Sequence, residues 1–226
     1  NNGHTLDKIE IIVLGGTFSS YPRSYQEEFI RDLFFAANTF NSEYDRAPLN
    51  IQEEKHLNES AEKKIIGISL ETRPDSITQY ELRRFRKLGC TRIQIGVQHT
   101  DNSILEKINR GHTIEQSVKA IRLIKEAGFK LDVHIMPDLP GATPAGDKVM
   151  IKSILTDEEF KPDYLKLYPC LDVEFTEIRK WKEEGKWKPY SEENKGQTLL
   201  DVCLIAKEHS TEYIRFNRIQ RDFPEE

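Results

Sequence analysis

Short apolar runs alternate along the chain with longer stretches in which apolar residues recur three or four positions apart. The short runs predict strands, because buried strands of a parallel sheet are apolar on both faces; they fall at 9–14, 64–70, 92–97, 129–135, 164–167 and 213–219. The longer stretches predict amphipathic helices at about 25–38, 77–88, 102–108, 114–127, 146–155, 175–184 and 192–207. Strand and helix therefore alternate, which is typical of an α/β protein.

Each predicted strand ends in a polar or glycine-rich signature, and the strands recur at intervals of roughly 30 to 55 residues, as expected of right-handed βα units. This pattern favours a barrel or part-barrel whose active face gathers the carboxyl ends of the strands. A flat, doubly wound sheet is the alternative. We find no internal repeat and no interdomain linker, so we expect one domain.

The composition limits the possible partners. The 226 residues suffice for one large α/β domain, and 33 basic against 38 acidic residues give a net charge of −5. Nucleic acid would therefore have to bind a local patch. The sequence contains no membrane-length apolar run and no signal-peptide pattern, so we expect a cytoplasmic protein without a membrane partner.

The three cysteines, Cys90, Cys170 and Cys203, are far apart and form no CxxC pair. A sparse, odd count argues against a disulfide framework, and the spacing supplies no local zinc or iron–sulfur motif. We expect each cysteine to be a small buried or half-buried residue and this chain to hold no metal.

The first predicted strand ends in the sequence IIVLGGTF, residues 11–18. Its four consecutive apolar residues predict a strand that is covered on both faces. Gly15 and Gly16 can adopt backbone angles that other residues avoid, and they let a ligand approach the main chain. A ligand site and a tight βα turn without a ligand are equally compatible with this stretch alone.

The other strand ends contribute a mixed set of donors and acceptors: Glu71, Arg73, Gln98, His134, Met136, Asp138, Lys166 and Tyr168. Such a ring could hold an amino-acid moiety, because Glu71 suits an ammonium group and Arg73 or Lys166 a carboxylate. Glu71, Lys166 and Tyr168 are the candidates for catalysis, although no nucleophile–base motif or P-loop assigns a catalytic residue. The alternatives are a hydrogen-bonded core histidine at His134, a structural Glu71–Arg73 ion pair and simple packing of Tyr168.

Two basic segments are candidates for nucleic-acid contacts: RRFRK at 83–87 and RKWKEEGKWK at 179–188. Their candidate residues are Arg83, Arg84, Arg86, Lys186 and Lys188. Solvated helices are the alternative; we interpret Trp181 as a packing residue and leave Trp187 open between packing and stacking. In the last strand Arg215, Arg218 and Arg221 alternate between faces, so the pattern alone does not make them one patch.

Seven motifs occur in register along the chain: DKIEIIVLGGTF, GISLETRPD, GCTRIQIGVQ, NRGHT, HIMPDLPG, KPDYLKLYP and RIQRDFP. Together they resemble the radical S-adenosylmethionine (SAM) domain of the catalytic subunit of Elongator, the tRNA wobble-uridine-modifying enzyme. The resemblance runs from about His4 to Pro224. Segments 41–63 and 142–148 do not obviously match.

The resemblance implies a partial, TIM-like (β/α)6 radical SAM barrel, with SAM across the strand ends beside a 4Fe-4S cluster. In that family the cluster cleaves SAM to a 5′-deoxyadenosyl radical. The radical is thought to activate an acetyl group from acetyl-CoA, which is added to carbon 5 of the wobble uridine. The implied partners are the tRNA anticodon stem-loop and, in a eukaryotic-type protein, other Elongator subunits.

The resemblance also implies roles for single residues. Gly15, Gly16 and Thr17 stand where radical SAM enzymes carry the glycine-pair motif that holds the methionyl ammonium. Glu71, Arg73, Gln98 and His134 stand at later strand ends that meet SAM. Lys8, in the DKIE motif, matches a lysine that the family associates with acetyl-CoA.

Two departures from the family matter. Its cluster cysteines lie upstream of the matched region, and its acetyltransferase domain follows it, so residues 1–226 are expected to be a partial radical SAM core without either. Such a chain is either part of a longer enzyme or a natural short form, and alone it is expected to be inactive. The alternative function is a cluster-less, non-catalytic barrel that binds tRNA or a partner subunit. A different radical SAM reaction, such as porphyrin or methylthio chemistry, is a third reading.

Overall fold

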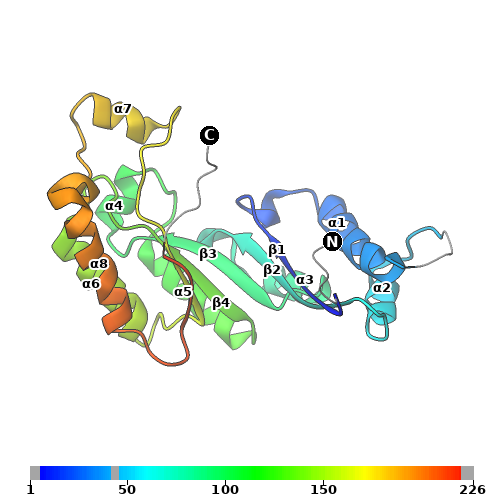
Figure 1. Cartoon of the computed structure of the whole chain (residues 1–226). Coiled ribbons are helices and arrows are strands. Elements are labelled where there is room, and N and C mark those ends of the chain that lie inside the picture. The colour runs from blue at the N-terminus through cyan, green and yellow to red at the C-terminus, as the bar shows by residue number, and fades with distance from the viewer. Residues whose placement is uncertain (1–5, 42–45, 220–226) are drawn as a thin grey trace.

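The six strands form one parallel sheet in which spatial order follows chain order. A computed structural model describes residues 6–41 and 46–219. The strands are β1 (Lys8–Val13), β2 (Lys64–Thr72), β3 (Arg92–Gln98), β4 (Lys130–Ile135), β5 (Tyr164–Leu167) and β6 (Arg215–Arg218). A doubly wound sheet reverses its strand order, whereas this sheet proceeds in one direction and curls (Figure 1). The predicted part-barrel is confirmed, and the flat-sheet alternative is wrong.

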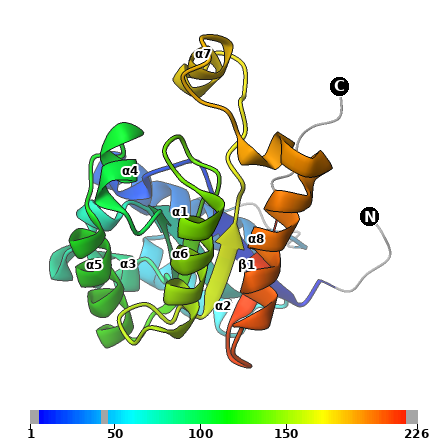
Figure 2. The ribbon, with the colours of Figure 1, turned by 90° about the vertical axis from the view of Figure 1, so that its left-hand side faces the viewer.

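Most helices lie on the convex face of the curled sheet, whereas the helix Glu177–Glu183 projects away from the sheet (Figure 2). The helices are α1 (Arg23–Thr39), α2 (Ile51–Asn58), α3 (Gln79–Lys87), α4 (Asn102–Lys107), α5 (Ile114–Glu126), α6 (Pro144–Thr156), α7 (Glu177–Glu183) and α8 (Gln197–Glu208). Among the described residues no helix is long and apolar enough to cross a membrane. Residues 220–224, the end of the RIQRDFP motif with Arg221, lie outside the described residues.

Several helix starts differ from the prediction by about two residues, and those of α3 and α8 have identifiable causes. The side chain of Thr78 caps α3 by accepting a hydrogen bond from the Glu81 N–H, because Pro74–Ser76 form a separate 3-10 turn. The predicted helix 192–207 is broken, since Asn194, Lys195 and Gly196 have positive φ angles of 49°, 57° and 87°. Helix α8 therefore begins only at Gln197.

The outer face of the sheet and the inner faces of the helices form the main core. Buried residues that contribute to it include Phe85, Ile93, Ile95, Leu131 and Ile151. A second, smaller cluster lies near the strand ends and contains Ile104, Leu139, Cys170 and Trp187, with Trp181 packed against it. The packing interpretation of Trp181 is confirmed, and Trp187 is a packing residue as well.

Strand β1 departs from its predicted environment. Ile12 is 49% exposed and Leu14 63% exposed, so the prediction of a strand covered on both faces is wrong. The reason is topological: β1 is an edge strand that pairs only with β2, and its inner face borders the hollow of the curled sheet.

A buried polar network fixes the segment that follows β4. The Asp147 carboxylate accepts hydrogen bonds from the Tyr190 hydroxyl at 2.6 Å and the Asp138 N–H at 2.7 Å, and lies 3.0 Å from Nε2 of His99. Asp138 in turn accepts from the backbone N–H groups of Tyr190 and Ser191, both at 2.9 Å. Asp138, a strand-end candidate in the sequence, is thus an anchor for the loop between α7 and α8.

Candidate functional site

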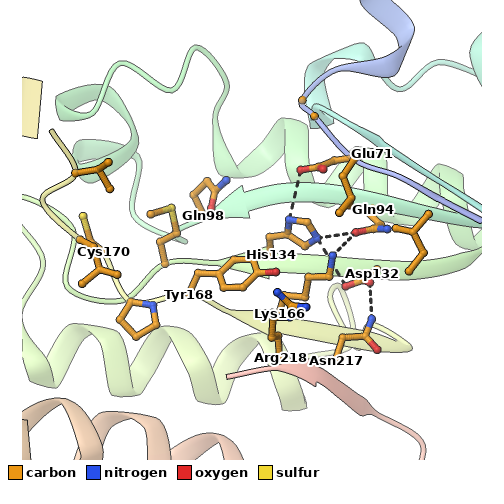
Figure 3. A pocket seen from close by; sticks show the side chains of 18 of the residues that line it. Glu71, Gln94, Gln98, Asp132, His134, Lys166, Tyr168, Cys170, Asn217 and Arg218 are labelled. Carbon is orange, nitrogen blue, oxygen red and sulfur yellow. Dashed lines mark hydrogen bonds and ion pairs between the residues drawn. The ribbon is translucent and has the colours of Figure 1, made fainter. Parts of the chain in front are cut away.

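The concave face of the sheet encloses a cavity of about 890 Å³. Its walls come from all six strands and from the segment that follows β5 (Figure 3). The lining residues include the glycine pair and a set of polar and charged side chains: Gly15, Gly16, Glu10, Glu71, Arg92, Gln94, Gln98, Asp132, His134, Lys166, Tyr168, Arg215, Asn217 and Arg218. The volume is at the upper end of the range of small-molecule sites, about 300–1,000 Å³.

The walls are polar because successive strand residues point to opposite faces of a sheet. Within β4 the inner residues are Asp132 and His134, whereas Leu131 and Val133 belong to the apolar core outside. Strand β3 repeats the pattern, with Gln94 inside and Ile93 and Ile95 outside. The alternation of polar and apolar residues along these strands therefore places the polar side chains in the cavity wall and the apolar side chains in the core.

The glycine pair lies on the cavity wall directly after β1. Gly15 and Gly16 have φ angles of +119° and +106°, which L side chains rarely adopt, and a Cβ at either position would meet nothing within 4 Å. The backbone conformation, not crowding, requires glycine here. The structure brings both residues to the cavity, while Thr17 stands at the start of the next 3-10 turn and is not among the lining residues.

His134 lies between two polar side chains of the wall. Its Nδ1 is 3.7 Å from Oε1 of Glu71, and its Nε2 is 3.1 Å from Oε1 of Gln94. Burial, followed by the positive charges of Lys166 and Arg110, lowers the pKa of His134 to about 3. The imidazole is therefore neutral, and its Nε2–H donates to Gln94.

Gln94 connects three strands. Its Nε2 donates to the Ser69 hydroxyl on β2 at 2.6 Å, which fixes Oε1 toward His134 on β4 and the ammonium group of Lys166 on β5. Burial lowers the pKa of Lys166. Lys166 and His134, which the sequence analysis named as candidates, thus share Oε1 of Gln94 as their acceptor. The sequence analysis did not identify Gln94.

Asp132 lies beneath these groups and is fully buried. Its Oδ2 accepts a hydrogen bond from Asn217 at 2.7 Å, and its Oδ1 has no hydrogen-bond partner among the described residues. Burial raises the pKa of Asp132 to about 6. Gln94, Asp132 and Asn217 were missed; for Gln94 and Asp132 the available signal was a polar residue at every second position of an otherwise apolar strand.

Two further candidates reach the cavity. Gln98 ends β3 with a φ of +70°, and its buried Oε1 has no partner among the described residues. Tyr168 lies edge-on to the His134 ring, with ring centroids 5.8 Å apart. A polar ligand in the cavity can therefore contact both the Oε1 of Gln98 and the ring of Tyr168.

Arg73 and Lys8 lie elsewhere. Arg73 donates two hydrogen bonds to Asp75, at 2.9 and 3.0 Å, so its ion pair is with Asp75 and not with Glu71. Lys8 is exposed at the start of β1. Neither residue belongs to the cavity lining in the described ranges.

The basic candidates also lie outside the cavity lining. Arg84 binds Glu81 and Gln26, and Arg86 donates to the carbonyls of Cys90 and Ala127. Arg83 and Lys188 are exposed, and Lys186 is exposed and paired with Glu184 at 2.6 Å. The contacts of Arg84 and Arg86 hold α3 in place. Of the three arginines of α3, Arg83 is therefore the most available for contact with a nucleic acid.

The described residues contain no group of three or more His, Cys, Asp or Glu side chains that could hold a metal ion. Burial raises the pKa of the Cys90 and Cys170 thiols to about 12, so both are neutral. Cys170 lines the cavity and Cys203 lies on α8. These residues do not fit a 4Fe-4S cluster.

A parallel part-barrel with a polar cavity at the strand ends defines an α/β ligand-binding domain of the barrel class. The chain belongs to the radical SAM superfamily, whose family model matches residues 4–150, and residues 162–226 match the radical SAM C-terminal domain. The expected family is thereby confirmed. Radical SAM proteins use SAM and a 4Fe-4S cluster.

The curated relatives narrow the resemblance. A tRNA uridine(34) acetyltransferase of Methanocaldococcus infernus is 39% identical over 98% of this chain and 40% of its own length. The Elongator complex protein 3 of Saccharomyces cerevisiae is 36% identical over 98% of this chain and 38% of its own length. The chain therefore spans about two fifths of these relatives.

Solved structures agree with the fold. The archaeal Methanocaldococcus infernus Elp3 with an N-terminal deletion superposes with a TM-score of 0.89 at 38% identity, covering 98% of this chain and 50% of that one. Coproporphyrinogen III oxidase from Escherichia coli superposes with a TM-score of 0.56 at 16% identity, over 89% of this chain and 52% of that one. The second likeness shows the fold alone.

Unlike the cluster, SAM fits the residues present. A cradle of two glycines with positive φ, the Glu71 carboxylate and the orphaned Oε1 of Gln98 all border one cavity. They offer backbone groups, an anion and an acceptor, which suit the ammonium and hydroxyl groups of SAM.

Proposed function

We propose that this chain is the SAM-binding barrel of a radical SAM enzyme that modifies the wobble uridine of tRNA. The observation that supports this most strongly is the glycine pair facing the polar cavity, together with 36–39% identity to tRNA uridine(34) acetyltransferases and Elongator complex protein 3 across 98% of the chain. Open space beside a glycine also occurs at the turn glycine Gly185, so it is the position of Gly15 and Gly16 on the polar cavity wall that supports the proposal.

In this proposal each wall residue has a binding task. Backbone groups of Gly15 and Gly16, with Thr17 beside them, hold the amino-acid end of SAM, and Glu71 accepts hydrogen bonds from its ammonium group. Gln98 and neutral His134 contact the remainder, while Tyr168 and Lys166 face the substrate side. Bound SAM supplies one-electron chemistry; the chain positions the reactants and keeps water out. Arg73 acts at most indirectly, by shaping the rim through Asp75.

The finer chemistry follows the relatives. We propose acetyl-CoA as the acyl donor, with Lys8 near its path, and a carboxymethyl precursor attached at carbon 5 of the uridine. The cluster ligands and the acetyltransferase domain would then belong to parts of the protein beyond residues 1–226. Elongator subunits are partners only in a eukaryotic-type assembly.

The tRNA anticodon stem-loop is the proposed nucleic-acid ligand. Arg83, Lys186 and Lys188 are its candidate phosphate contacts, with Arg84 and Arg86 limited by their structural bonds. Because each phosphate contact releases counterions, affinity should fall steeply with added salt. A flat salt response would remove these residues from the tRNA site.

The glycine pair provides the decisive test. In the holoenzyme with a reconstituted cluster, Gly16→Trp should abolish SAM cleavage, because the indole would fill the open space that the glycine leaves beside the cavity. Gly185→Trp is the matched control, since Gly185 has a φ of +70° and equally open surroundings outside the cavity lining. Unchanged cleavage by Gly16→Trp would refute the assignment.

A non-catalytic barrel that binds tRNA or a partner subunit is the second candidate, and the absence of a metal-binding group from the described residues favours it. After iron–sulfur reconstitution the chain alone should stay colourless. A brown product with cluster absorption would contradict both this candidate and the expectation that the cluster ligands lie elsewhere.

A further inference from the structure

Three exposed tyrosines lie where α1 and α3 begin, beyond the carboxyl ends of β1 and β2. Tyr21 is 49% exposed, Tyr25 47% and Tyr80 52%. The rings of Tyr21 and Tyr25 have centroids 5.3 Å apart, and the Arg23 guanidinium lies 5.0 Å from the ring centroid of Tyr80. These four residues, Tyr21, Arg23, Tyr25 and Tyr80, form an aromatic platform on the strand-end side of the sheet.

The rings of the platform are held from below. The buried Phe18 lies 6.4 Å from the ring of Tyr21, and Phe29 stacks on Tyr25 at 6.0 Å with an interplanar angle of 22°. Phe18 and Phe29 also contact each other, with centroids 6.4 Å apart. A ligand that stacks on the exposed rings therefore finds them already ordered, which lowers the entropic cost of binding.

The backbone of the platform is fixed by a buried side chain. Gln26 is fully buried, and its Nε2 donates to the carbonyl of Tyr21 at 2.7 Å. Its Oε1 accepts from Arg84 at 3.1 Å. Arg84 lies one turn after Tyr80 on α3, so Gln26 joins the two helices that carry the tyrosines.

The platform adjoins the mouth of the cavity. The 3-10 turn Phe18–Ser20 connects it to Gly16, which lines the cavity. The Ser19 hydroxyl forms a hydrogen bond with the Thr72 hydroxyl at 2.8 Å, and Thr72 directly follows Glu71, another lining residue. A polymer that places one unit in the cavity would therefore lay its neighbouring units on this rim.

Cations without ion pairs surround the tyrosines. Arg23 is exposed and forms no ion pair among the described residues, although Glu27 lies one turn along α1. Arg83 and Lys87 follow Tyr80 at the i+3 and i+7 positions, so all three share one face of α3. Both are exposed and have no ion pair within the described ranges. Their charge favours a polyanion over an apolar protein surface.

We propose that the aromatic platform stacks the unpaired bases that flank the target nucleotide of an RNA loop. Aromatic rings bind the faces of unpaired bases with little regard to sequence, and arginine adds cation–π and phosphate contacts. In a duplex those faces are covered by neighbouring base pairs, so the platform selects single-stranded RNA. The proposal rests on the proposed function, in which the target uridine enters the cavity.

Three RNA probes test the platform by fluorescence anisotropy on the full chain at low ionic strength. They are an anticodon stem-loop, an uninterrupted duplex with the sequence of its stem, and an unstructured oligouridylate. The two probes with unpaired bases bind more tightly than the duplex. Tyr21→Ala and Tyr80→Ala each weaken their binding roughly tenfold and leave the duplex unchanged. With 2-aminopurine in the loop, the wild type quenches its fluorescence by stacking, and both variants quench it less.

Two kinds of control separate stacking from misfolding. Tyr213→Ala removes a tyrosine that is 54% exposed before the start of β6, at the opposite end of the sheet, and should bind as the wild type does. Tyr80→Phe keeps the ring and should restore both affinity and quenching. This recovery, with an unchanged circular dichroism spectrum, assigns the loss in Tyr80→Ala to the ring itself.

The outcomes also distinguish the platform from the proposed function. If the stem-loop binds the wild type and both alanine variants equally, the platform is refuted and the tRNA function stands. If oligouridylate binding depends on the tyrosines but the stem-loop binds no better than the duplex, the platform stands and the anticodon assignment falls. If neither single-stranded probe binds, the platform is refuted, and SAM cleavage by Gly16→Trp still decides the function of the cavity.

Discussion

Nδ1 of His134 lies 3.7 Å from Oε1 of Glu71, although β2 and β4 are separated by β3. The curl of the sheet brings the two side chains together. Because the pKa of His134 is lowered to about 3, the imidazole is neutral near pH 7 and the contact is not an ion pair. The Glu71 carboxylate therefore keeps its charge available for a cationic ligand.

Glu71→Gln is expected to weaken SAM binding by roughly five- to thirtyfold, since a charge-assisted hydrogen bond becomes a neutral one worth about 1–2 kcal/mol less. Titration calorimetry with SAM measures the effect. Glu208→Gln, an exposed carboxylate near the end of α8, is the control of equal charge. Equal affinities for the two variants would exclude Glu71 from the SAM site.

Gly16→Ala separates backbone strain from ligand contact. The positive φ of Gly16 makes any L residue unfavourable by about 1–2 kcal/mol, and the same holds at Gly185. Both alanine variants should lose comparable stability in urea, whereas only Gly16→Ala should weaken SAM binding. A similar loss of SAM affinity in Gly185→Ala would mean that strain alone explains the effect.

Asp147→Ala is expected to destabilise the fold by about 3–5 kcal/mol, because it leaves buried donors of Tyr190 and Asp138 without an acceptor. Tyr190→Phe removes one of those bonds and should cost about 1–2 kcal/mol. Urea unfolding measures both. A loss below about 1 kcal/mol for Asp147→Ala would show that water replaces the network.

Asp132 predicts a pH effect on stability. Its pKa is raised to about 6 by burial, so between the unfolded pKa of about 4 and pH 6 the folded state binds more protons, and Asp132 costs increasing stability as pH rises. The cost above pH 6 is roughly 3 kcal/mol, since each pKa unit corresponds to about 1.4 kcal/mol. Neutral His134 has the opposite slope in this window, since it favours the folded state more as pH rises.

The difference between Asp132→Asn and the wild type isolates the Asp132 contribution. Charged neighbours of Asp132 are Lys166, Arg92 and Glu71, and none of them changes in the variant. The stability of Asp132→Asn relative to the wild type should rise from pH 4 to pH 6 and then level off, as followed by urea unfolding. A constant difference would show that Asp132 titrates at an ordinary pKa.

The strands and most helices could be predicted because period and capping are local. Thr113 and Asp101 are residue types that favour the N-cap position, and both cap the helices that follow them. The break before α8 was missed because the apolar period across 192–207 was weighed above a local signal, since Asn194 and Gly196 are residue types that adopt positive φ angles readily.

The site was predictable only in part for a related reason. Strand ends pointed to Glu71, Gln98 and His134, all of which line the cavity. Gln94 and Asp132 lie inside their strands, and only the curl of the sheet turns that inner face into a cavity wall. The assumption that a parallel strand is covered on both faces concealed them, and it was wrong for Ile12 as well.

The six strands follow one another in space as they do in the sequence, so the position of a residue in the chain also gives its position around the cavity wall. The first third of the chain contributes Glu10 and Glu71 to the cavity wall, and the last third contributes Lys166 and Arg218. Substitutions in the first third of the chain therefore alter mainly the wall near the glycine pair, and substitutions in the last third alter mainly the wall near β5 and β6.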